Sequence, residues 1–335
     1  MEQSVQAMFE LYLSRNRLRP ASVDMKRRAC RFFLEWFGQP VRSPDGEVGF
    51  DLPLRCVTSA LADDYREKLG QDRSAVSVNG YLNNFRPFWA WLRKRGDITV
   101  DPFGFIGPVK VDEEPPRETF TARELARLMA VASAVEQLQL CFGLLSCRRG
   151  EMQAIQVCDV RLGDPDGAHV LLKHKKGGDK TLPWGAKGHK ARLIGLPAAM
   201  AFDGRIVALQ ELVAARIKEL HGEPEGYLCV EERFIRKRLA GPRHWGALRD
   251  LQGNHPRSFR ALQRRAGIRE PRRFHELRSA FITMMLDAGI DSIRVAQLAG
   301  HASVQQTRQY DRHKWLSLVT EAAQVAAGGY VSKAS

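Results

Sequence analysis

Residue types suited to phosphate chemistry gather between residues 274 and 310. Within FHELRSAF, a histidine and an arginine stand three residues apart, at His275 and Arg278. A second histidine, His301, follows in a Gly-His pair, and Tyr310 comes nine residues after it. The short helical patterns around these residues do not require polar groups at these positions. We therefore treat the four side chains as candidates for function.

Metal-free phosphoryl transfer is the chemistry that these residue types suit. Guanidinium groups bind phosphate oxygens bidentately and match the charge of a pentavalent transition state. A cationic pocket favours the phenolate of a tyrosine, whose ordinary pKa is about 10, and so makes attack feasible. A lysine with a lowered pKa could protonate the oxygen that leaves.

Two other chemistries fit the sequence poorly. Metal sites that act on phosphodiesters collect carboxylates, whereas the polar neighbours of His275 and His301 are arginines, so we expect no metal. A serine hydrolase would require a G-x-S-x-G turn, which does not occur. The sequence also has neither a P-loop nor a dinucleotide fingerprint, and we expect no cofactor.

Earlier in the chain, Arg148 and Glu151 stand in SCRRGEMQAI among apolar residues. A positive side chain that is buried there without a partner would cost several kcal/mol. Arg148 must therefore either pair, for example with Glu151, or reach into an anion site. The residues alone leave both alternatives open.

The charge of the chain points to a polyanionic partner. The net charge is +14 over 335 residues, with 17 Lys and Arg against 16 Asp and Glu in residues 1–115 and 35 against 22 in the remainder. Nucleic acid fits better than a membrane, because no basic amphipathic helix stands apart from the core patterns.

Cysteine usage and the N-terminal sequence bear on location. The six cysteines are scattered without a C-x-x-C pair, so neither a disulfide framework nor a zinc site is expected. No apolar run is as long as a membrane span, and the first residues lack the pattern of a secretory signal. We expect a cytoplasmic protein.

The apolar spacing predicts a helical first domain, residues 1–106, followed by a linker. Residues 41–54 are expected to form a loop, and the linker, residues 107–118, carries three prolines and an acidic run. The helices of this domain are expected at Val5–Leu13, Pro20–Gly38, Thr58–Leu69 and Val76–Lys94.

The second domain, residues 119–335, is predicted to be α+β, so that the whole chain is mainly α with a small β-sheet. A helix should begin at Thr121, where T-A-R-E has the spacing of a capping box. Glycine-containing tips at 175–180 and 186–190 carry lysines, and helices should resume after Pro197. Short strands are expected at Val157–Leu162, His169–Leu172 and Arg192–Leu196.

Four motifs in order resemble those of the tyrosine recombinases of the phage integrase family. SCRRGE is similar to the family's first arginine box, although Ser146 and Cys147 replace the usual glycine and leucine. FHELR, LAGH and TRQY are similar to the three later boxes. NNFRPFWAWL and FTARELARL resemble segments of its core-binding and catalytic domains, so the likeness covers nearly the whole chain.

The resemblance implies a set of catalytic residues. Tyr310 would be the nucleophile, and a hairpin lysine would be the general acid. That lysine is Lys187 in AKGHKARLIGLP, with Lys176 in KKGGDKTLPW as the alternative. The residues that would stabilise the phosphorane, handle protons or support the site are Arg148, Arg278, His301, His275 and Glu151.

The resemblance further implies site-specific DNA recombination through a 3′-phosphotyrosyl intermediate, with no need for ATP. The two domains would form a C-shaped clamp on double-stranded DNA with inverted-repeat core sites. A homotetramer would act through a Holliday junction, with accessory DNA-bending proteins as further partners and association with the nucleoid on DNA. The segment 315–322 would dock on a neighbouring subunit or pack on its own domain.

Two other functions remain open at the level of sequence. One is a non-catalytic DNA-binding or architectural protein on the same fold, against which the complete set of candidate residues argues. The other is a type IB-like topoisomerase, which would use the same chemistry to relax DNA without choosing a sequence.

Overall fold

The computed structural model describes most of the chain as two compact units, residues 1–114 and 115–335. Among the described residues, no helix has the length and apolar character that crossing a membrane requires. Much of the expected linker, residues 112–118, lies outside the described part. The described residues are 3–16, 18, 20–42, 48–111, 119–184, 191–240 and 255–300.

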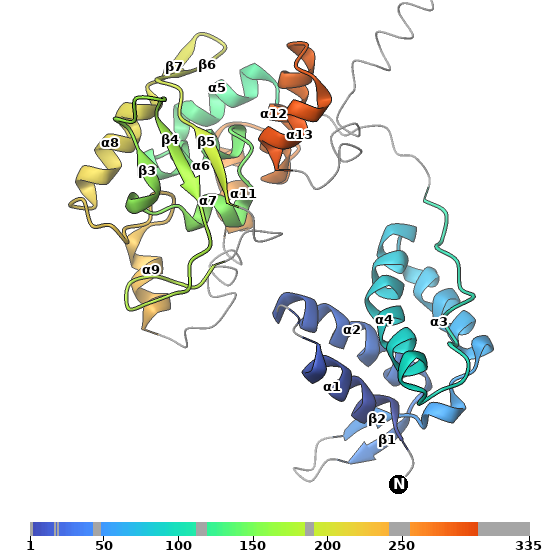
Figure 1. Cartoon of the computed structure of the whole chain (residues 1–335). Coiled ribbons are helices and arrows are strands. Elements are labelled where there is room, and N and C mark those ends of the chain that lie inside the picture. Colours follow the sequence, from blue (N-terminus) through green and yellow to red (C-terminus); the bar gives the residue numbers. More distant parts are fainter. Residues whose placement is uncertain are drawn as a thin grey trace, which may run out of the picture. The chain divides into compact units, whose positions relative to one another are not determined.

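Unit 1 is a helical bundle with one small hairpin (Figure 1). The helices α1, α3 and α4 begin at polar caps: Ser4, Thr58 and Ser74 each accept the backbone N–H of the residue three positions later. The bundle encloses aromatic side chains such as Phe33, which meets Tyr65 edge to face. The elements are α1 Val5–Arg15, α2 Pro20–Phe37, β1 Gln39–Arg42, β2 Val48–Asp51, η1 Leu54–Cys56, α3 Ser59–Asp72 and α4 Ala75–Arg95.

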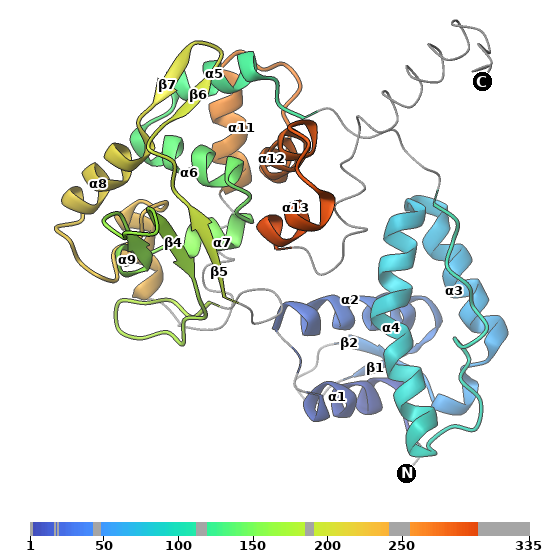
Figure 2. The ribbon, with the colours of Figure 1, turned by 45° about the horizontal axis from the view of Figure 1, so that its top comes forward.

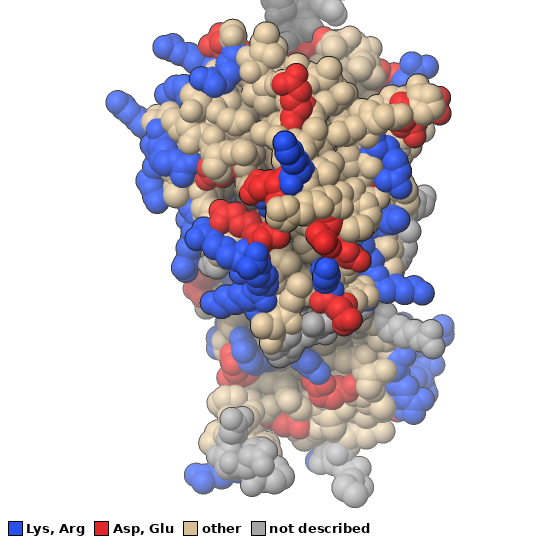
Figure 3. Space-filling view, turned by 90° about the vertical axis from the view of Figure 1, so that its left-hand side faces the viewer, with Lys and Arg blue, Asp and Glu red and all other residues tan. Residues whose placement is uncertain are grey.

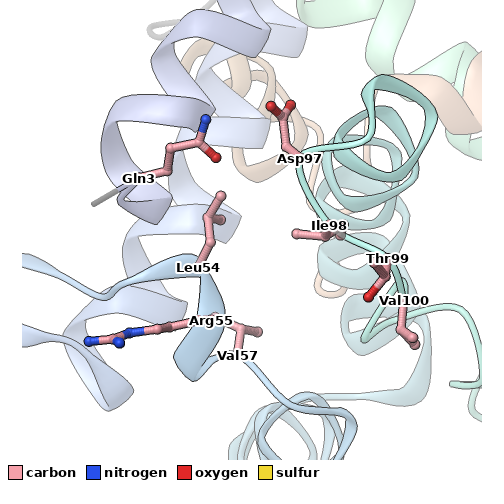
Figure 4. A pocket seen from close by; sticks show the side chains of 8 residues that line it. All are labelled: Gln3, Leu54, Arg55, Val57, Asp97, Ile98, Thr99 and Val100. Atoms are coloured by element: carbon pink, nitrogen blue, oxygen red, sulfur yellow. The ribbon is translucent and has the colours of Figure 1, made fainter. Parts of the chain in front are cut away.

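A hollow of ≈ 480 Å³ lies in unit 1 between the start of α1, η1 and the segment after α4 (Figure 4). Leu54 and Arg55 line one side, and Asp97 with the three residues after it lines the other. None of the candidate residues from the sequence analysis lines this hollow.

Unit 2 is built around α6, which packs against α7, α8 and α12. Both α5 and α6 start with complete capping boxes, so the helix predicted at Thr121 is confirmed. The helices are α5 Ala122–Val131, α6 Ala134–Leu144, α7 Arg149–Ala154, η2 Val157–Asp159, α8 Leu209–Glu219, α9 Glu232–Leu239, α11 His255–Arg265, α12 His275–Asp287 and α13 Ser292–Ala299.

A three-stranded antiparallel sheet with the order β3–β4–β5 lies beside these helices (Figures 1 and 2). Its strands are β3 Val160–Arg161, β4 His169–Leu172 and β5 Arg192–Gly195. Leu172, the last residue of β4, is opposite Arg192, the first residue of β5. The mainly α fold with a small β-sheet is confirmed.

Two hairpins correct the sequence-based assignment. β1 and β2 pair largely within the segment expected to be a loop, with β1 beginning two residues before it, and their almost wholly exposed faces explain why no half-buried alternation reveals them. After Pro197, where helix was expected, β6 Met200–Phe202 and β7 Arg205–Val207 pair across Asp203-Gly204. Both turn residues have positive φ, as a two-residue hairpin turn requires.

Close contact between α6 and α12 brings two distant parts of the sequence together. A Cβ built on Gly143 of α6 would lie 2.8 Å from Leu277 Cδ1 and 3.1 Å from Phe274 Cζ. A side chain at this position would force Leu277 and Phe274 to shift, so glycine lets the two helices lie this close. The contact places the start of α12 beside the turn that follows α6, and that turn contains Ser146 and Arg148.

Candidate active site

Arg148 stands at the N-terminus of α7 and pairs with Glu151 in the first turn of the helix. Its Nη1 donates to Glu151 Oε1 at 2.7 Å, and its backbone N–H donates to Glu151 Oε2 at 2.7 Å. The Arg148 side chain is 28% exposed, whereas that of Glu151 is only 5% exposed. Of the two alternatives left open by the sequence, the structure shows the pairing with Glu151, and part of the Arg148 side chain still reaches solvent.

Glu151 is shared with a second arginine, Arg192. Arg192 Nη2 donates to Glu151 Oε2 at 2.5 Å and to the Ser146 carbonyl at 3.0 Å. Burial opposes ionisation of Glu151, but Arg192 and Arg148 outweigh it and hold the pKa of the carboxyl below its usual value. One carboxylate thus serves two guanidinium groups.

Arg278 lies on the first turn of α12 and is 1% exposed. Its Nη1 donates to the Ser146 carbonyl and its Nη2 to the Ala299 carbonyl. Ser146 has a φ of +67°, a left-handed conformation that is uncommon for residues other than glycine. The turn before Arg148 therefore presents its carbonyl to two arginines, Arg192 and Arg278.

Three arginines converge on the C-terminal end of α13. The carbonyls of Leu298, Ala299 and Gly300 accept hydrogen bonds from Arg192, Arg278 and Arg148 respectively. The last carbonyls of a helix have no partner within the helix and carry partial negative charge, so cations stabilise them. The chain leaves this point directly into His301.

His275 is the first residue of α12 and borders a cationic hollow of ≈ 470 Å³. Although His275 as a whole residue is exposed, burial of its imidazole by neighbouring groups and the charge of Arg278 lower its pKa below the usual 6.5. The residues that line the hollow include no carboxylate and are Arg149, Phe259, Arg260, Pro271, Arg272, Arg273, Phe274 and His275. The hollow is therefore suited to an anion.

We expect the imidazole of His275 to titrate below pH 6.5 in an NMR pH titration. Replacing Glu276 with glutamine should move the midpoint lower still, because the Glu276 carboxylate raises the pKa of His275. The neutral ring is favoured in the folded state, so protonation below pH 6.5 should lower the free energy of unfolding. A midpoint above 6.5 in the wild type, or an upward shift in Glu276→Gln, would contradict this assignment.

The two candidate lysines belong to the excursion between β4 and β5. Lys175 is buried, and its Nζ donates to Asp159 at 2.5 Å and to Gln156 at 2.7 Å. Lys176 is the next residue and is exposed. Lys187 lies outside the described residues, as do His301 and Tyr310. The structure thus brings Arg148, Glu151 and Arg278 together, with His275 three residues before Arg278.

Sequence reasoning did not identify Arg192 and Ser146 as parts of this site. Arg192 was expected only as the first residue of a strand, and Ser146 only as a departure from a motif. The signal for Arg192 was its place in KGHKARLIGLP, the segment used to choose between the lysines. Among the described residues, no group of three or more His, Cys, Asp or Glu side chains could hold a metal ion.

Surface charge is uneven on the face that Figure 3 shows. Acidic and basic side chains lie close together near the centre of this face, whereas Lys and Arg predominate toward its sides. Unit 2 also has the cationic hollow beside His275. An extended polyanion such as a nucleic acid backbone is the partner that such surfaces attract.

Comparison with known proteins relates the chain to a family. Residues 249–315 match the model of the phage integrase family. The chain is 24% identical over 304 residues to tyrosine recombinase XerA of Thermococcus kodakarensis, which covers 91% of this chain and 89% of that protein.

Solved structures share the fold across both units. The integrase of transposon Tn1549, in complex with a circular intermediate DNA, matches with a TM-score of 0.65 and 14% identity, covering 96% of this chain and 98% of the other. A lambda integrase tetramer bound to a Holliday junction matches with a TM-score of 0.61 and 16% identity, covering 93% and 78% of the two chains.

Proposed function

We infer that this chain, which belongs to the phage integrase family of tyrosine recombinases, recombines DNA at specific sites by cutting and rejoining strands. The observation that carries this inference is the convergence of Arg148, Arg278 and Arg192 on the end of α13, one residue before His301. With Glu151 as the only carboxylate bonded to this group among the described residues, the cluster keeps a net positive charge suited to a phosphodiester.

In the proposed reaction, the Tyr310 phenolate attacks the scissile phosphorus and the bond from phosphorus to the 5′ oxygen breaks. Arg148 and Arg278, with His301, stabilise the negative charge on the nonbridging oxygens. His275, neutral at pH 7 because its pKa is lowered, is able to take up the phenol proton. Lys187, with Lys176 as the alternative, protonates the 5′ oxygen.

The reaction leaves a 3′-phosphotyrosyl link and a free 5′-hydroxyl. A 5′-hydroxyl from another strand then attacks the link, restores the phosphodiester and releases Tyr310. Because one phosphoester is exchanged for another at each step, no nucleotide hydrolysis is needed. Carboxylate-bridged metals are equally unnecessary, since guanidinium groups supply the positive charge.

We further propose double-stranded DNA with inverted-repeat core sites as the substrate and a homotetramer as the active form. The DNA complexes and the Holliday-junction tetramer among the structural relatives support this proposal. In a cell the chain would act in the cytoplasm at the nucleoid, with DNA-bending proteins as accessory partners.

Trapping the covalent intermediate tests the function. A duplex carrying a nick near the cleavage point loses the short 5′-hydroxyl fragment after cleavage, so the protein stays linked to the labelled 3′ end. We expect wild-type protein to form a covalent complex that survives denaturing gel electrophoresis, and Tyr310→Phe to form none. DNA flanking the encoding gene, with its repeats, is the first substrate to use.

The control is DNA binding at several salt concentrations, which Tyr310→Phe should retain. Undiminished trapping by Tyr310→Phe would contradict the assignment of Tyr310 as the nucleophile. Salt-sensitive binding without trapping by the wild type would favour a non-catalytic DNA-binding protein. Relaxation of plasmids that lack the site would favour a topoisomerase.

A further inference from the structure

Arg192 is held inside the candidate site, although it belongs to the edge strand of the sheet. Its side chain is 15% exposed, compared with 28% for Arg148. Nη1 donates to Ser146 Oγ at 3.2 Å and to the Leu298 carbonyl at 2.8 Å, while Nη2 donates to the Ser146 carbonyl and to Glu151. Nε is buried with no hydrogen bond to any described residue. The guanidinium is therefore surrounded by protein.

The partners of Arg192 are the same groups that hold the two proposed catalytic arginines. It shares Glu151 with Arg148 and the Ser146 carbonyl with Arg278. A rigid planar guanidinium can satisfy acceptors in several fixed directions, which an ammonium group cannot do. Any movement of Arg192 would thus disturb both arginines together.

Arg192 also fixes the end of α13. It donates to the Leu298 carbonyl, and Ser146 Oγ donates to the same carbonyl at 3.2 Å. Gly300 ends the helix with a φ of +65°, and a Cβ there would lie 3.2 Å from Arg192 Cδ. The backbone that leads into His301 therefore lies directly against Arg192.

Three arginines gathered in one place, two of them bonded to a single carboxylate, are costly to bury. Fold stability alone would be served as well by an apolar side chain at position 192. Catalysis depends on orienting hydrogen-bond donors before the reaction begins. A need to place charged groups accurately therefore explains the arrangement better than fold stability does.

We propose that Arg192 is a positioning residue for strand cleavage, which holds the end of α13 against Arg148 and Arg278. This inference rests on the proposed recombinase function. Arg192 touches no reacting atom in this scheme. Its effect reaches the phosphate only through its neighbours.

The test compares Arg192→Ala and Arg192→Lys with Arg161→Ala on a nicked duplex. Arg161 is a matched control, since it lies in β3 of the same sheet, is exposed and, among the described residues, donates only to the carbonyls of Cys158 and Val160. At saturating protein we expect the cleavage rate of Arg192→Ala to fall about 100-fold, the loss that a misplacement of about 1 Å can cause. Its Kd for DNA should stay within about threefold, because a buried arginine contributes little to long-range attraction. Arg192→Lys should cleave at about one tenth of the wild-type rate. The control Arg161→Ala should cleave at the wild-type rate.

A second measurement separates positioning from folding. Hydrogen exchange of the peptide containing Leu298 to His301 should be faster in Arg192→Ala than in Arg161→Ala, under conditions where circular dichroism shows both folded. Cleavage by Arg192→Ala at the wild-type rate would overturn the proposal. A loss of DNA binding large enough to account for the whole loss of cleavage would also overturn it. If Arg192→Ala does not fold, the cleavage rate and DNA affinity of Arg192→Lys test the proposal by the same criteria. Absence of trapping by the wild type would instead overturn the recombinase function itself.

Discussion

Replacing Arg278 with alanine is expected to slow strand cleavage about 10²- to 10³-fold, the loss typical of removing one preorganised donor from a transition-state site. The change should also destabilise unit 2. Arg278 is 1% exposed and donates to the carbonyls of Ser146 and Ala299. Ser146 keeps Arg192 as a donor, but the Ala299 carbonyl loses its guanidinium partner, at a cost of about 1–3 kcal/mol. Thermal unfolding and single-turnover cleavage of a nicked duplex measure the two effects.

Two further variants complete the experiment: Arg278→Lys tests the need for a guanidinium, and Arg236→Ala is the control for loss of an arginine. Lysine preserves the charge but lacks the planar fork, so the rate should stay low while part of the stability returns. Arg236 is 78% exposed on α9 and pairs with Glu232, so its removal should change stability by no more than about 0.5 kcal/mol and leave cleavage unaffected. A folded Arg278→Ala protein that cleaves at the wild-type rate would remove Arg278 from the mechanism.

Local sequence patterns predicted those parts of the site that depend on near neighbours. Arg148 and Glu151 are three residues apart at a helix start, so an ion pair between them follows from helical geometry. The capping box at Thr121 fixed the beginning of α5 in the same way. β4 spans the predicted residues 169–172, a short apolar stretch between turn residues, and its burial alternates along the strand.

The remaining features depend on contacts between residues far apart in the sequence. Arg192 reaches Glu151, 41 residues earlier, and Leu298, 106 residues later. No local pattern reveals such contacts, because the packing of α6 against α12 and the register of β5 create them. The β1–β2 hairpin escaped prediction for another reason, since its exposed strands carry no burial signal.

The identity of the general acid depends on how the chain runs between β4 and β5. Lys175 exchanges both backbone hydrogen bonds with Trp184, and its side chain points inward to Asp159. Successive side chains of extended backbone point to opposite sides. The exposure of Lys176, next to the buried Lys175, agrees with this rule. Lys187 precedes Arg192 by five residues in the sequence. Arg192 in turn shares Glu151 with Arg148.

Replacing Lys187 with alanine is therefore expected to slow cleavage of ordinary DNA about 10²- to 10⁴-fold, the usual contribution of a general acid. Lys176→Ala, a matched loss of charge in the same excursion, should leave the rate unchanged. A substrate with sulfur in place of the 5′ bridging oxygen should restore cleavage by Lys187→Ala. A thiol has a pKa of about 8.5, far below that of an alcohol, so its anion leaves without a proton.

The sulfur substrate also separates a missing acid from a disordered site. Arg278→Ala should remain slow on it, because sulfur replaces the proton donor but not the guanidinium that stabilises the phosphorane. If Lys176→Ala is the slow variant and sulfur restores it, the general acid is Lys176 and the chain must turn so that its exposed side faces the DNA. If sulfur restores neither variant, the leaving oxygen takes its proton from a group outside this hairpin. Cleavage rates of the two lysine variants on the oxygen and sulfur substrates thus identify the residue that protonates the leaving oxygen. They do so without a structure that shows the lysine beside the phosphate.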